Sequence, residues 1–72
     1  IPYSVEILTQ LEKFDNIMKI YQDILVMKDS QKSILIGKKG EKIKMIGSRA
    51  RIEIQKIVKK KVFLSLKVKK KD

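Results

Sequence analysis

The feature that most constrains this chain is a pair of glycines three residues apart, in the segment Ile36-Gly37-Lys38-Lys39-Gly40-Glu41. Glycine has no Cβ, so its backbone can turn sharply and approach another group closely. An apolar run leads into this segment and a basic amphipathic stretch follows it. Two lysines on such a loop favour a phosphate backbone as the group approached. A tetrapeptide of this kind is also common as an ordinary turn between helices, and that interpretation stays open.

The residues after the loop have the period of a helix. From Glu41 the apolar and small side chains recur every three or four positions, at Ile43, Ile46, Gly47, Ala50, Ile54, Ile57 and Val58. This pattern predicts a helix from Glu41 to about residues 59–61. Gly47 and Ala50 are small residues on its inward stripe, so we expect them to let the helix approach a neighbouring helix or the sheet closely.

The residues before the loop predict a shorter helix. Asp29-Ser30 is a typical N-cap signal, and a helix over residues 31–36 would end at Gly37. A continuous strand through residues 33–36 is the local competitor, and propensity does not decide between them.

Alternation of apolar and polar residues predicts three strands, over residues 3–12, 20–28 and 62–68. Residues 14–18 are interpreted as a connection, and residues 69–72 as a frayed end. The predicted fold is therefore an α+β two-layer sandwich with helices on one face of three strands. The predicted core is Val5, Ile7, Leu11, Ile24, Val26, Ile34, Ile43, Ile46, Ala50, Ile54, Ile57, Val62, Leu64 and Leu66.

Composition excludes several classes of protein. The 72 residues allow one small domain, 1–72, and 43% apolar content is ordinary for a folded one. Because the chain has no cysteine and no histidine, disulfide frameworks, Cys/His zinc sites and Cys or His catalysis are excluded. No carboxylate pair suggests acid–base catalysis, so we expect no enzymatic activity, cofactor, metal or small-molecule substrate. No apolar run approaches the roughly 18 residues of a membrane span.

The charge of the chain is unevenly distributed. Residues 1–31 carry a net charge of −2, and residues 32–72 carry 15 basic against three acidic residues, a net charge of +12. A half-domain this basic is typical of a protein that binds a polyanion. RNA, DNA and an anionic membrane surface all fit this charge, and so does a general role in solubility.

The candidate binding residues follow from the loop. Lys38 and Lys39 would attract phosphate, and the helix start at Gly40–Lys42 would offer unpaired N–H groups. Ile36, Ile43 and one face of the second strand would line an apolar groove for bases, with Ile36 partly exposed. An amide side chain such as Gln31 would read base edges. The four aromatic rings do not cluster in the sequence, and we expect Tyr3 and Phe63 to lie in the core.

Residues 30–47, SQKSILIGKKGEKIKMIG, resemble the signature of type II KH domains, and more narrowly the C-terminal KH domain of the Era-type GTPases. Several neighbouring segments agree: Pro2-Tyr3-Ser4-Val5, Ile24-Leu25-Val26, Ala50-Arg51 and Val62-Phe63-Leu64. The resemblance implies an αββααβ fold with a mixed sheet, although the helix expected before Pro2 and the GTPase domain are missing from this sequence.

The resemblance also implies a function and a location. It implies binding of single-stranded RNA near the 3′ end of small-subunit ribosomal RNA during ribosome assembly, by a monomer that is cytoplasmic or peripheral to the membrane. The family's nucleotide-clamping loop falls on Gly37, Lys38, Lys39 and Gly40. Its groove-lining positions fall on Ile36 and Ile43, and its Gln-Lys pair on Gln31 and Lys32. Lys42, at the helix start, completes the candidate set.

Two alternatives to RNA binding remain. The chain could dock electrostatically on an anionic membrane or on an acidic protein surface, or it could only support an attached GTPase domain.

Overall fold

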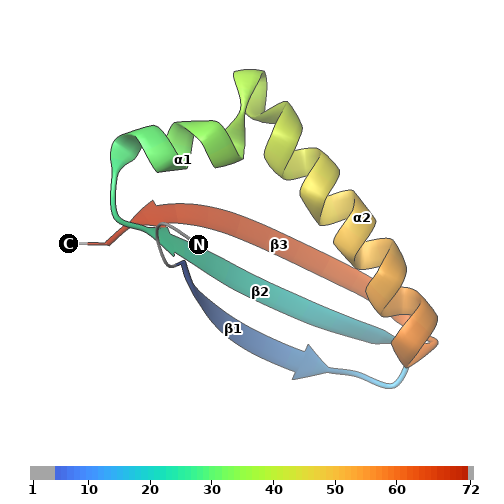
Figure 1. Cartoon of the computed structure of the whole chain (residues 1–72). Helices are drawn as coiled ribbons and strands as arrows, with labels where there is room; N and C mark the ends of the chain where they lie inside the picture. Colours follow the sequence, from blue (N-terminus) through green and yellow to red (C-terminus); the bar gives the residue numbers. More distant parts are fainter. Residues whose placement is uncertain (1–4, 72) are drawn as a thin grey trace.

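The chain folds into a three-stranded sheet with two helices on one face (Figure 1). The computed structural model describes residues 5–71. In chain order the elements are β1 (Glu6–Lys13), β2 (Ile17–Val26), α1 (Asp29–Ile36), a single 3-10 turn η1 (Lys38–Gly40), α2 (Glu41–Val58) and β3 (Lys61–Lys70). The predicted short helix before the loop is confirmed, and the competing strand is not formed.

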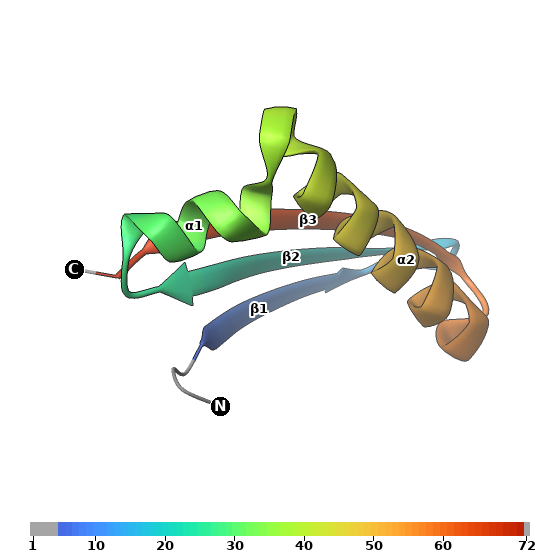
Figure 2. The same cartoon turned by 45° about the horizontal axis from the view of Figure 1, so that its top comes forward.

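The sheet is mixed, with the strand order β1-β2-β3. β1 and β2 form an antiparallel hairpin in which Ile7 pairs with Ile24. β2 and β3 run parallel, with Ile20 beside Leu64. A parallel pair needs a long crossover connection, and here the connection consists of α1, η1 and α2. Figures 1 and 2 show both helices on the same face of the sheet, so the predicted α+β two-layer fold is confirmed.

Predicted boundaries were wrong at both ends of the second strand and at the start of α1. β2 spans Ile17–Val26, so residues 17 and 18 belong to the strand rather than to the connection, and residues 27 and 28 lie outside it. The predicted Asp29-Ser30 cap does not form, because α1 already begins at Asp29. Instead the Oε1 atom of Gln31 accepts hydrogen bonds from the backbone N–H groups of Met27 (2.9 Å) and Lys28 (3.0 Å). A side chain inside the helix thus secures the turn that precedes it.

The C-terminal lysines are ordered by the sheet, so the prediction of a frayed end was wrong for residues 69–71. Lys70 pairs with Val26 at the end of the parallel ladder, and the Lys71 N–H donates to the Val26 carbonyl at 2.7 Å. The Lys69 ammonium lies 3.1 Å from the Asp23 carboxylate. Backbone pairing therefore continues through a stretch whose charge suggested solvation. Asp72 lies outside the described residues, as does Tyr3.

The buried core is small and lies between the helices and the β2–β3 pair. Ile20, Val26, Val62 and Val68 are each less than one-tenth exposed. Part of the predicted core is half-buried, namely Ile24, Ile43, Ile46, Ala50, Ile54, Leu64 and Leu66. The remaining predicted core residues are exposed and were wrongly assigned: Val5, Ile7, Leu11, Ile34 and Ile57.

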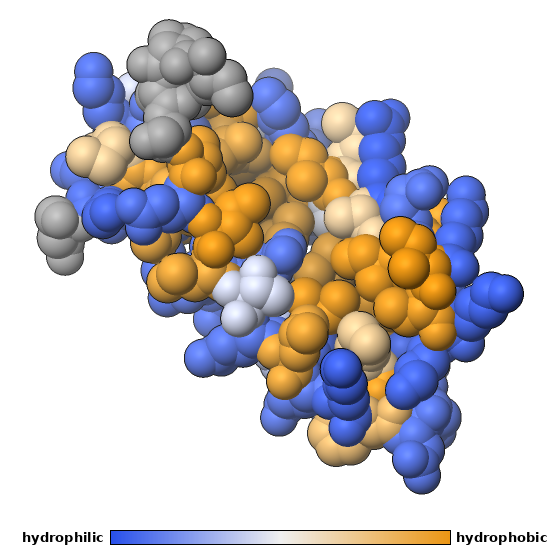
Figure 3. Space-filling model, turned by 60° about the horizontal axis from the view of Figure 1, so that its bottom comes forward, coloured by the Kyte–Doolittle hydropathy of each residue, from blue (hydrophilic) through white to orange (hydrophobic). Residues whose placement is uncertain are grey.

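The exposed apolar residues have a common cause in the placement of the helices. α2 contacts β3, and α1 contacts β2, β3 and α2, so the helices lie over the parallel pair. Ile7 and Leu11 share the helix side of the sheet with Ile24 and Ile20, but they lie on the strand that the helices do not cover. Figure 3 shows broad apolar areas around a hollow on the surface of the molecule.

We predict that stability is concentrated in the β2–β3 core. Val26→Ala removes two methyl groups from a side chain that is 1% exposed, and it should lower the free energy of unfolding by about 2 kcal/mol. Ile57→Ala is the matched control, because Ile57 is 79% exposed and its truncation should change stability by less than about 0.5 kcal/mol. Urea denaturation followed by circular dichroism measures both, and equal losses would contradict the assignment of the core.

Candidate nucleic-acid interface

The loop between α1 and α2 depends on the backbone of Gly37. This residue has φ 75° and ψ 178°, a region that essentially only glycine occupies. A Cβ built on Gly37 would lie 2.7 Å from the Cβ of Lys42 and 3.1 Å from its backbone N. Both the dihedral angles and the contact with the start of α2 therefore require glycine here.

The second half of the loop is left-handed. Lys39 has φ 55° and Gly40 has φ 73°, and a Cβ on Gly40 would meet nothing within 4 Å. Gly40 is thus required only for its conformation. The Gly40 N–H donates to the Gly37 carbonyl at 3.2 Å, and the Glu41 N–H donates to the Lys38 carbonyl. Two of the N–H groups that the sequence assigned to a phosphate are therefore already bonded inside the loop.

The loop places its two lysines in solvent. Lys38 and Lys39 are both exposed, and Figure 1 shows the turn that carries them projecting away from the sheet at the junction of α1 and α2. The backbone of the loop is determined by Gly37 and Gly40, so the lysine side chains take no part in holding it. They are free to neutralise a polyanion that reaches this end of the molecule.

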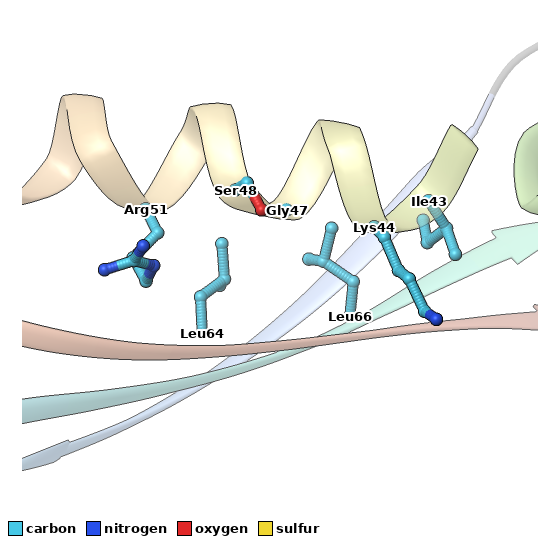
Figure 4. Close-up of a pocket in the computed structure, with 7 residues that line it drawn as sticks. All are labelled: Ile43, Lys44, Gly47, Ser48, Arg51, Leu64 and Leu66. Atoms are coloured by element: carbon cyan, nitrogen blue, oxygen red, sulfur yellow. The ribbon is translucent and has the colours of Figure 1, made fainter. Parts of the chain in front are cut away.

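A groove of about 380 Å³ runs between α2 and β3. Its lining residues are Ile43, Lys44, Gly47, Ser48 and Arg51 from α2, with Leu64 and Leu66 from β3. Figure 4 shows the two leucines rising from β3 toward α2, with Lys44 and Arg51 at opposite ends of the helix segment. These two cations are two helical turns apart, roughly 10 Å along the axis. The groove thus combines an apolar floor with a positive charge toward each end.

Gly47 sets the width of the groove at its centre. A Cβ on Gly47 would lie 3.5 Å from Cδ1 of Leu66, an ordinary van der Waals contact. The predicted close approach of the long helix to the sheet at Gly47 is confirmed by this distance. Because glycine has no side chain, the space above Leu66 stays open.

Gln55 joins the far end of α2 to β3. Its Oε1 atom accepts hydrogen bonds from the Val62 N–H at 3.0 Å and from Nη1 of Arg51 at 3.2 Å. The Lys59 N–H, in a left-handed residue, donates to the Gln55 carbonyl at 2.9 Å and ends the helix. The Gln55 side chain therefore holds the end of α2 next to β3, and it positions the Arg51 guanidinium at the end of the groove.

The structure places the nine predicted site residues in different parts of the molecule. Ile43 lines the groove, and Gly37, Lys38, Lys39 and Gly40 form the adjoining loop. Ile36 is half-buried, as expected, but it is not among the groove's lining residues. Lys32 is half-buried on α1. Gln31 and Lys42 instead line a separate hollow of about 170 Å³ together with Val5, Val26, Ile34 and Leu35.

The groove between α2 and β3 is not the groove that the sequence predicted. We expected one face of the second strand to line it, but its strand residues come from β3, whereas Val26 of β2 lines the separate hollow with Gln31 and Lys42. Residues missed were Lys44, Gly47, Ser48, Arg51, Leu64 and Leu66. A signal for part of this set was present, because Lys44, Gly47, Ser48 and Arg51 follow i, i+3, i+4, i+7 spacing on one helix face. Neither a metal-binding cluster of acidic residues nor a helix capable of crossing a membrane is found among residues 5–71.

We predict different costs for the two loop glycines. Gly37→Ala adds a steric clash to a glycine-only conformation and should lower the free energy of unfolding by at least about 2 kcal/mol. Gly40→Ala meets open space and should cost only about 1 kcal/mol for the left-handed backbone. Thermal and urea denaturation of the two variants checks the order. A Gly40 variant less stable than the Gly37 variant would show that the loop geometry is wrong.

Comparison with known proteins agrees with this geometry. The family model described as KH domain matches residues 1–72. Among curated proteins, the GTPase Era of Helicobacter pylori strain Shi470 is 46% identical over 94% of this chain. The GTPase Era of a Neisseria meningitidis serogroup C strain is 44% identical over 96% of the chain. The chain spans 23% of the length of each of these relatives.

Solved structures give the same result. A crystal structure of Era in complex with MgGDPNP and nucleotides 1506–1542 of 16S ribosomal RNA superposes with a TM-score of 0.87 and 36% identity, over 99% of this chain and 25% of that one. Aquifex aeolicus Era bound to GDP.AlF4− matches equally well, also at TM-score 0.87. Because the family model matches residues 1–72 and the two curated relatives are 46% and 44% identical to this chain, it belongs to the KH domain family.

Proposed function

We propose that this chain binds single-stranded RNA in the groove between α2 and β3, with the Gly37–Gly40 loop as the phosphate clamp. We further propose that it does so as the RNA-binding part of an Era-type GTPase, on the 3′ end of small-subunit ribosomal RNA during ribosome assembly in the cytoplasm. The observation that carries the proposal is the groove itself, an apolar floor with a cation toward each end, opening beside an exposed Lys-Lys pair. The 16S ribosomal RNA in one of the solved Era structures that resemble this chain supports the choice of RNA.

The groove suits unstacked nucleotides for physical reasons. Leu64 and Leu66 offer an apolar surface for base faces, while Lys44 and Arg51 can neutralise the phosphates that flank those bases. The loop adds two further ammonium groups that need no partner within the fold. A duplex presents its bases stacked and paired, so it would gain only the electrostatic part of this binding.

The residues proposed to contact RNA therefore differ in role. Lys38 and Lys39 contact phosphate, and Gly37 and Gly40 hold the loop in its shape. Ile43 contacts bases, and Lys32, Ile36 and Lys42 lie on the flanking helices. Gln31 keeps its amide NH₂ group for a base edge, because its oxygen already accepts two backbone N–H groups.

We predict that reversing the loop charges separates binding from folding. The double change Lys38→Asp and Lys39→Asp should leave stability nearly unchanged, because both side chains are exposed. Affinity for a short single strand should fall, and the dependence of affinity on salt should weaken by roughly one counterion for each lysine that touches phosphate. Fluorescence anisotropy with single-stranded and duplex RNA at two salt concentrations measures both effects.

The matched control is Lys13→Asp with Lys59→Asp, which changes the net charge equally at the opposite end of the molecule from the loop (Figure 1). It should bind the short RNA nearly as well as the unmodified chain. If both variants lose affinity for RNA equally, and duplex is bound as tightly as single strands, electrostatic docking on a membrane or acidic surface is favoured instead. An unchanged affinity in the folded loop variant would contradict the proposal.

We also predict that Gly47→Ala makes the domain more stable and a poorer RNA binder. Alanine is favoured over glycine in a helix by up to about 1 kcal/mol, and its Cβ would meet Leu66 without a clash. The same methyl group occupies the centre of the groove, so single-stranded RNA should bind more weakly. Denaturation and anisotropy on one sample test this pair of opposite effects. A variant that binds RNA as well as the unmodified chain would exclude the space above Leu66 as a base site.

A further inference from the structure

The sheet has a second usable surface, the outer face that the helices do not cover. Val62 and Val68 are buried under the helices, so the alternate residues of β3 point to the opposite side. Those residues include Phe63, Ser65 and Lys67, and their partners on β2 include Lys19 and Tyr21. Phe63 is 47% exposed, so its predicted place in the core was wrong.

Aromatic rings gather on this outer face although they are scattered in the sequence. The ring centroids of Tyr21 and Phe63 lie 5.9 Å apart with their planes inclined at 59°. Lys19, the direct neighbour of Phe63 across the strands, holds its ammonium 5.6 Å from the centre of the Phe14 ring. Phe14 is itself 47% exposed. We call Phe14, Tyr21 and Phe63 the aromatic platform; it contains every aromatic ring among the described residues.

Positive charge surrounds the platform. Lys61 and Lys67 share the outer side of β3 with Phe63, and neither belongs to an ion pair among residues 5–71. Two acids on this face are already engaged: Asp23 pairs with Lys69, and Glu6 pairs with Lys71. Glu12 lies near the Tyr21 phenol: burial first, and then the hydrogen bond and charge of this carboxylate, raise the pKa of the phenol. A polyanion would therefore meet two lysines, Lys61 and Lys67, that are unpaired among the described residues, on a face where Asp23 and Glu6 are already paired.

A hollow of about 260 Å³ lies on this side, lined by Tyr21 and Ser65 with Lys67 and Lys69 among others. It and the groove lie on opposite sides of the same strand, because Leu64 and Leu66 point to the groove while Ser65 and Lys67 point outward. β3 is the last strand of the sheet, so its outer edge carries no further strand among the described residues. A flexible chain leaving the groove can pass over that edge.

We propose that the aromatic platform is a second contact for single-stranded RNA, on which bases stack after the strand has left the α2–β3 groove. The inference rests on the proposed RNA binding, but it concerns a different face and different residues. Aromatic rings accept the face of any base, and neighbouring lysines follow the phosphates, so this contact adds affinity with little sequence preference. The competing explanation is that the rings only stabilise pairing of β2 with β3.

The test compares two lengths of RNA. One has about four nucleotides, the length that a KH loop clamps, and the other about twelve, within the range that stacking surfaces bind. Phe63→Leu keeps apolar bulk and removes the ring. It should weaken binding of the longer RNA by about fivefold or more and leave the shorter RNA unchanged. The control is Ile57→Ala, an apolar truncation on α2 of a side chain that is 79% exposed and lines neither the groove nor the hollow, and it should alter neither affinity.

A second measurement needs no variant. In NMR spectra of the unmodified chain, the ring signals of Phe63 and Tyr21 should shift on adding the longer RNA and not the shorter one. If Phe63→Leu binds both RNAs like the unmodified chain, or the ring signals do not move, the platform is structural only and the inference is overturned. The variant with Lys38→Asp and Lys39→Asp tests the groove separately, because it should weaken binding of both lengths of RNA. If the platform proves to be structural only, the proposed function is therefore unaffected.

Discussion

The parallel pairing of β2 with β3 is the constraint on which the rest of the molecule depends. Two parallel strands cannot be joined by a tight turn, so the chain must cross the sheet between them, and α1, η1 and α2 form this crossover. The crossover packs its helices over the pair that it joins and leaves β1 uncovered. The small buried core, the exposed β1 side chains and the position of the Gly-Lys-Lys-Gly loop all follow from this one connection.

β3 then gives the domain two different surfaces. Its alternating side chains place Val62 and Val68 in the core, Leu64 and Leu66 toward the groove, and Phe63 and Lys67 on the outer face. An edge strand with an exposed ladder risks pairing with other chains, and the lysines along β3 oppose such aggregation. The same lysines attract a polyanion to the strand. Protection against aggregation and binding of a polyanion therefore depend on the same side chains.

The sequence predicted the type and order of the elements well, because each depends on local patterning. Helical spacing after Glu41 and alternation around Leu64 are properties of neighbouring residues, and both predicted elements form. Burial was predicted less well. Ile7 and Leu11 have the alternation of core residues, but no helix lies over their strand, and alternation does not show which face or strand is covered. For the same reason the sequence did not predict that β3 lines the groove beside α2.

What the sequence by itself determined is the loop and its chemistry: two glycines that permit left-handed backbone, two lysines between them, and the helix that follows. These are short-range effects of missing Cβ atoms and of helical period. The tertiary structure alone decided which surfaces surround the loop. It placed Gly47 of α2 opposite Leu66 of β3 in the lining of the groove. It also brought Tyr21 and Phe63, 42 positions apart in the sequence, to a ring separation of 5.9 Å. Contacts across the sheet depend on strand order and register, and these are set by how the crossover packs rather than by any single segment.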